Sequence, residues 1–233
     1  MIYSILLALH GLVGLVALVT YWLAAFARKG SPWHRTVGKL YMVAMLGIVV
    51  TAIPMTVIIA WLGKYPLALF LGYLAIVTAT GVWLGWRSIR RKNDQSAFRD
   101  RAYLVVALVN IAAAAASATV GAKIGQPLLI GFSAVGFIGG AQMLIRRARP
   151  VANARWWLRE HFAAMIGCGV ATHVAFLQIG FARLAQMFGL HPPAWYSLLG
   201  WFLPVAVSVA VGIRLNRKYM PKARATAPTP AHA

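Results

Sequence analysis

The sequence predicts an all-α membrane protein, a single polytopic bundle of about seven transmembrane helices with its amino terminus outside and its carboxy terminus in the cytoplasm. Two observations lead to this fold class. The chain is 61% apolar and has only 3 acidic residues, too few polar side chains for the surface of a soluble globule. In addition, all but three of its 23 Lys and Arg residues lie in four clusters, each beside a long apolar run.

The basic clusters lie at 28–39, 87–101, 146–159 and 214–224, and so follow every second apolar run. Basic loops face the cytoplasm by the positive-inside rule, which sets the orientation. The net charge of +20 therefore belongs to juxtamembrane loops that meet lipid head groups, and nucleic acid is rejected as a partner. We expect a multi-pass protein of the bacterial inner (cytoplasmic) membrane, with the lipid bilayer as its first partner.

The apolar runs are about 20 residues long, the length a helix needs to cross about 30 Å of hydrocarbon. The first run lacks the basic start of a secretory signal and is interpreted as a retained helix. Ser31 followed by Pro32 predicts a capped helix start before the second run. Residues 1–222 form one domain and 223–233 a disordered cytoplasmic tail. The predicted spans are 2–27, 38–62, 67–86, 102–122, 128–145, 158–186 and 195–214.

Four of the 6 histidines lie in or beside spans, where an ionisable side chain is costly unless it faces a partner inside the protein. At about 1.5 Å per residue, His34 and His161 fall near the cytoplasmic surface. His173 lies roughly 18 Å further out, and His10 can reach the same level if its helix tilts. The sequence therefore predicts two layers, each holding two imidazoles.

Two layers of paired histidines are the arrangement of a membrane cytochrome with two haems. Our hypothesis is a b-type electron-transfer protein in which His10 and His173 ligate an outer haem b iron, and His34 and His161 an inner one. Such a protein would be a component of a membrane oxidoreductase, with a quinone or a redox protein as partner. Small residues four positions from a histidine would leave room for the macrocycle: Gly14, Gly38 and Gly169.

Three alternatives remain open for these histidines. They can act as hydrogen-bonding contacts between helices. They can relay protons or bind a small solute in a transporter or membrane accessory protein, around His10, His173 and Asn110. A zinc or copper site built from His34, His161 and Glu160 is the third. Nucleotide and hydrolytic chemistry is disfavoured, because the chain has neither a phosphate-binding glycine loop nor an acidic pair.

The first two spans also carry a recognisable pattern. His10-x3-Gly14 is followed by Arg28-Lys29-Gly30-x3-His34-Arg35-x2-Gly38-x2-Tyr41. This pattern resembles the amino-terminal signature of a bacterial family of multi-pass membrane proteins, domain of unknown function 2306. Trp157-x3-His161-x3-Met165, continuing to Thr172-His173 and Phe176, looks like one variant of a later helix of that family. The resemblance implies a multi-pass membrane fold and implies no particular activity.

Overall fold

The computed structural model describes residues 1–149, 153–191 and 193–220, and these residues contain helices and no strand. Seven helical stretches are long and apolar enough to cross a membrane, which confirms the predicted number. The tail 223–233 lies outside the described residues. The helices are α1 (Ile2–Phe26), α2 (Pro32–Trp61), α3 (Tyr65–Arg90), α4 (Gln95–Phe98), α5 (Arg101–Lys123), α6 (Pro127–Ala148), α7 (Trp156–Ala175), the π-helix η1 (Phe176–Phe181), α8 (Ala182–Met187) and α9 (Ala194–Tyr219).

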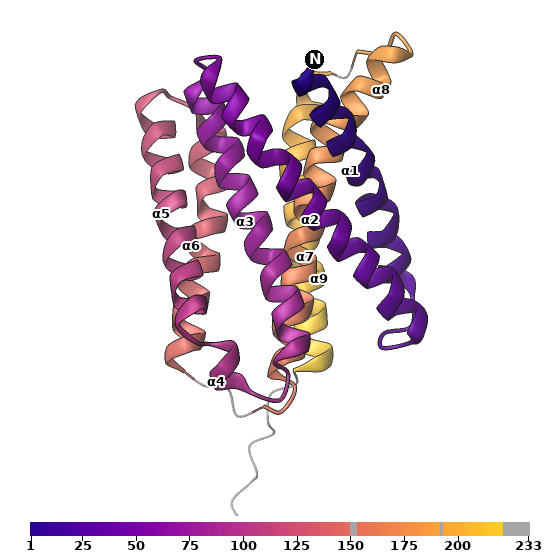
Figure 1. Ribbon diagram of the computed structural model, residues 1–233, viewed down its shortest axis with the longest axis vertical. Helices are drawn as coiled ribbons and strands as arrows, with labels where there is room; N and C mark the ends of the chain where they lie inside the picture. Colours follow the sequence, from indigo (N-terminus) through magenta and orange to yellow (C-terminus); the bar gives the residue numbers. More distant parts are fainter. Residues whose placement is uncertain (150–152, 192, 221–233) are drawn as a thin grey trace, which may run out of the picture.

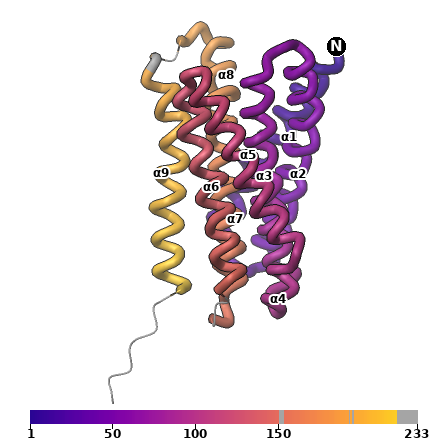
Figure 2. Tube along the Cα trace, turned by 90° about the vertical axis from the view of Figure 1, so that its left-hand side faces the viewer, coloured from indigo at the N-terminus to yellow at the C-terminus, as the bar shows by residue number. Residues whose placement is uncertain are grey.

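The long helices run up and down beside one another (Figure 1). α1 pairs with α2 at one side and α5 with α6 at the other, while α3 and α7 lie between these pairs and α9 packs on α7. The amino terminus and the end of α9 lie at opposite ends of the bundle (Figures 1 and 2). The α1–α2 loop, α4 and the start of α7 lie at the same end as the last turn of α9. We call this the basic end, because the described residues of the four basic clusters belong to these elements or adjoin them.

The outer surface of the bundle is apolar along the spans. Leu12 on α1 is 60% exposed, Val43 on α2 61% and Leu198 on α9 65%. An apolar surface of this extent would be unfavourable in water and is favourable against acyl chains. The chain is therefore an integral membrane protein, and its outward side chains contact lipid.

Small residues bring neighbouring helices into close contact. A Cβ atom on Gly81 of α3 would lie 2.7 Å from Cys168 Sγ of α7, and one on Gly140 of α6 would lie 2.8 Å from the backbone oxygen of Ala107. Both positions belong to the small-residue pairs of the sequence, Gly81–Gly85 and Gly136–Gly140. Cys168 is buried at this contact and acts as a small packing residue.

The start of α2 confirms the predicted cap. The Ser31 hydroxyl accepts a hydrogen bond of 3.1 Å from the backbone N–H of His34, and Pro32 takes the first helical position. The second span therefore begins at the basic end, six residues before the apolar run, and this places His34 in its first turn.

Two elements were not predicted from the sequence. α4 is a single turn at the basic end, capped by Asp94 and anchored by the buried Phe98. The sixth span, predicted as one helix, changes to π geometry at Phe176–Phe181. The hydroxyl of Tyr196 on α9 donates a 2.8 Å hydrogen bond to the backbone oxygen of Leu177, so α9 satisfies part of the altered backbone.

Candidate functional site

Each of the four membrane histidines is half-buried and has its Nδ1 atom held by a neighbour. Three of these neighbours are backbone oxygens: that of Ala24 at 3.0 Å from His34, that of Gly85 at 3.4 Å from His161, and that of Gly169 at 2.7 Å from His173. His10 lies 2.8 Å from the hydroxyl of Thr51.

These contacts decide which ring nitrogen carries the proton. A carbonyl oxygen can only accept, so Nδ1 must donate in His34, His161 and His173. In the neutral imidazole, Nε2 then carries an unprotonated lone pair. Histidines that bind metals show this arrangement, in which the second ring nitrogen donates to a backbone carbonyl. Three of the four histidines are thus prepared as Nε2 ligands or bases.

His34 and His161 form the inner pair, and the structure brings them into the same region. His34 lies in the first turn of α2 and His161 in the second turn of α7, both at the basic end. The two rings are close enough to interact electrostatically, and Lys29 is also within this range of His161. Gly38, one turn after His34, has open space where a Cβ atom would lie. The donor chemistry of this pair is that of axial haem ligands.

The structure does not bring His10 and His173 together. The His173 ring packs edge-on against Tyr21 and Trp22 of α1, with centroid distances of 5.1 and 5.3 Å. These aromatic residues follow His10 by 11 and 12 positions, a rise of roughly 17 Å along α1. His10 is instead satisfied by α2, through Thr51 and the nearby backbone of Ile48. The predicted outer layer is therefore corrected, and these two residues do not fit one haem.

The space expected beside His173 is also occupied. A Cβ atom on Gly169 would lie 2.5 Å from the ring of Tyr21, so this glycine accommodates an aromatic side chain and leaves no room for a macrocycle. The hydroxyl of Tyr41, whose ring lies against Tyr21, is 3.3 Å from the hydroxyl of Thr172. Within this polar group, His173 Nε2 is buried and has no hydrogen-bond partner.

Glu160 has a role that sequence reasoning missed. Its carboxylate is 4% exposed and receives Arg146 at 2.8 Å and Arg99 at 3.4 Å. These contacts join α7 to the end of α6 and to the segment between α4 and α5. Among the described residues no three His, Cys, Asp or Glu side chains are grouped as possible metal ligands, so the structure does not assemble His34, His161 and Glu160 into the zinc or copper site of the third alternative. The sequence did carry a signal for this role, because Glu160 is a single acidic residue directly after the basic cluster at 146–159.

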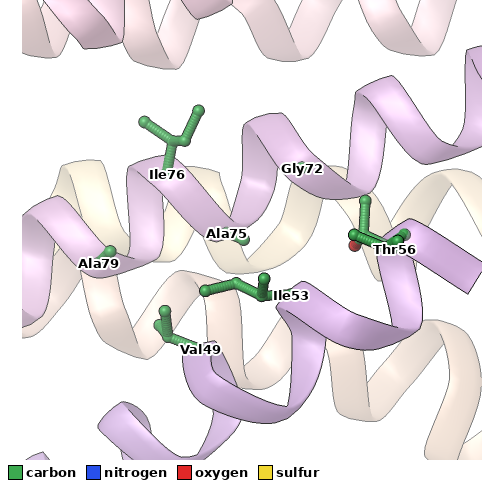
Figure 3. A pocket seen from close by; sticks show the side chains of 8 residues that line it. Val49, Ile53, Thr56, Gly72, Ala75, Ile76 and Ala79 are labelled. Atoms are coloured by element: carbon green, nitrogen blue, oxygen red, sulfur yellow. The ribbon is translucent and has the colours of Figure 1, made fainter.

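The other polar residues of the spans make contacts between helices. Asn110 donates 2.7 Å to the hydroxyl of Thr80, which joins α5 to α3 away from His10 and His173. The structure therefore does not bring Asn110 together with His10 and His173. An apolar groove of about 240 Å³ lies between α2 and α3 and is lined by no titratable side chain (Figure 3). It is open to the outer surface, where Ile53 is 55% exposed and Val57 49%. It is lined by Val49, Ile53, Thr56, Val57, Gly72, Ala75, Ile76 and Ala79.

Comparison with known proteins found no match in any of three searches: of protein-family models, of curated proteins and of solved structures. The resemblance to domain of unknown function 2306 thus remains a prediction from the motifs of the first two spans. The chain is a multi-pass membrane protein whose described residues form helices and no strand.

Proposed function

We propose that this protein is a b-type membrane cytochrome that holds one haem between His34 and His161 and transfers electrons at the cytoplasmic face of a bacterial inner membrane. One observation carries the proposal: both imidazoles donate Nδ1–H to a backbone oxygen, while Nε2 makes no hydrogen bond within the described residues. The haem would supply one-electron chemistry, and a quinone or redox protein would be its partner.

The backbone contacts would give these histidines two properties that a haem ligand needs. The oxygen of Ala24 fixes the ring of His34 against the end of α1, and the oxygen of Gly85 fixes that of His161 against α3. Each hydrogen bond also raises the basicity of the opposite nitrogen. Lys29 contributes a positive charge near this pair. We expect that charge to favour a propionate group and the reduced state of the iron.

Optical absorption of protein purified from cells with adequate haem supply tests the proposal. We expect sharp reduced-state bands and one haem per chain. His34→Ala and His161→Ala should each abolish the bands, whereas His10→Ala, which removes a histidine bonded to Thr51, should retain them. Pigment-free protein would refute the proposal, and so would equal loss of haem in the His10 variant.

The buried Nε2 of His173 supports a second candidate, a proton-relay role in a transporter or accessory protein. This atom is a base without a donor, and it lies beside Tyr21 in the contact between α1 and α7. Such a relay predicts proton uptake into vesicles that falls in His173→Gln and is retained in His10→Gln. Unchanged uptake in the His173 variant would reject it. This candidate does not require haem.

A further inference from the structure

We propose that four arginines at the basic end bind the phosphate group of an anionic phospholipid. The members of this inner arginine cluster are Arg99, Arg146, Arg147 and Arg159. The proposal is independent of haem and of the membrane histidines.

Positive charge exceeds negative charge in this cluster. Arg99 and Arg146 share the single carboxylate of Glu160. Arg147 donates through Nε to the backbone oxygen of Arg99 at 3.1 Å, and Arg159 interacts electrostatically with Arg99, Arg146 and Glu160. Three guanidinium groups thus interact with one acid, and the fourth, that of Arg147, lies beside them at Arg99. Charges taken out of water are unfavourable without a counter-charge, and a phosphate would supply the missing one.

Two buried polar groups at this cluster lack hydrogen-bond partners. Arg99 is 7% exposed and Tyr103 is fully buried, yet Arg99 Nε and the Tyr103 hydroxyl make no hydrogen bond. Tyr103 interacts electrostatically with Glu160, Arg99 and Arg146, so it belongs to the cluster. Both groups can donate a hydrogen bond, and a donor left unpaired inside a protein is costly. An anionic oxygen is the acceptor that satisfies them and also offsets the charge.

A lipid head group can reach the cluster from the surface of the bundle. Arg147 is exposed and Arg146 is partly exposed, so the cluster extends from the interior to the surface at the end of α6. Ile145, directly before Arg146, is 56% exposed on the lipid-facing surface. A phosphate with an attached acyl chain matches a guanidinium surface bordered by an apolar one. A free phosphate ion would not use the apolar part, so we assign the ligand to a phospholipid.

Thermal unfolding of the full chain in neutral detergent tests this assignment. Phosphatidylglycerol, phosphatidylcholine and inorganic phosphate are added separately. We expect phosphatidylglycerol at about a hundredfold excess over its Kd to raise Tm by roughly 5 to 10 °C relative to phosphatidylcholine. Native mass spectrometry should show one retained phosphatidylglycerol molecule per chain. An equal rise with inorganic phosphate, or no difference between the two lipids, would overturn the proposal.

A matched set of variants locates the site. Arg147→Gln and Arg159→Gln should each weaken phosphatidylglycerol binding by roughly fivefold, the loss of one cation near a lipid phosphate. Arg35→Gln removes an exposed arginine of the basic end outside the cluster, and it should leave binding unchanged. Arg159→Lys, which keeps the charge, should restore part of the affinity. If the Arg35 variant lost as much affinity as the others, the attraction would be diffuse and the site would be rejected.

Discussion

The buried carboxylate of Glu160 is expected to carry much of the stability of the basic end. We predict that Glu160→Gln, which keeps the size of the side chain and removes its charge, lowers the free energy of unfolding by about 3 to 5 kcal/mol. The structure supports a value of this size, because Arg99 and Arg146 are only 5% and 17% exposed and would lose their shared counter-ion. For a chain of this length, Tm should fall by roughly 6 to 20 °C.

A matched control is Asp100→Asn. Asp100 also pairs with an arginine, Arg87 at 2.7 Å, but its side chain is 45% exposed. Its carboxylate caps α5 at the N–H of Tyr103, and asparagine caps equally well. Because solvent screens an exposed pair, we expect a loss of at most about 1 kcal/mol.

Thermal unfolding of both variants in the same detergent measures the difference. If Glu160→Gln cost no more than Asp100→Asn, the reasoning from burial would be refuted. A loss confined to Glu160→Gln would identify the triad of Glu160, Arg99 and Arg146 as the ionic contact that stabilises this end of the bundle.

Three further predictions concern packing, hydrogen bonding and pH. Gly169→Ala should cost about 1 to 3 kcal/mol because the new methyl group meets the ring of Tyr21, whereas Gly167→Ala, with nothing within 4 Å, should cost nothing; thermal unfolding compares them. Tyr73→Phe removes hydrogen bonds of 2.7 and 2.9 Å to two backbone groups of α6 and should cost about 1 to 3 kcal/mol, measured in the same assay; a neutral result would contradict it. The N–H of Ala97 lowers the pKa of Asp94, so the α4 cap is present above the usual carboxyl pKa and is lost as pH falls through the lowered value; hydrogen exchange at Ala97 should rise there, and an unchanged rate would argue against the cap.

His10 and His173 lie at different heights because α1 and α7 are offset along the bundle. Equal depths for the two residues require that the end of α1 and the start of α7 lie at one level at the basic end. In Figure 1 the loop between α1 and α2 lies above the start of α7, so equal distances along the two helices do not reach equal depths. His173 consequently meets Tyr21, and His10 lies further from the basic end. Helix rise is a local property, whereas the relative height of two helices depends on how they pack.

The sequence by itself determined the number of spans, the positions of the basic clusters and the capped start of α2 at Ser31. These features follow from segment length, charge and local backbone chemistry, which are properties of short stretches of chain. Only the tertiary structure decided which neighbour each histidine contacts, that Tyr21 fills the space beside Gly169, and that Glu160 holds two arginines. Those contacts join residues far apart in the sequence, and helix tilt and vertical offset select them during packing.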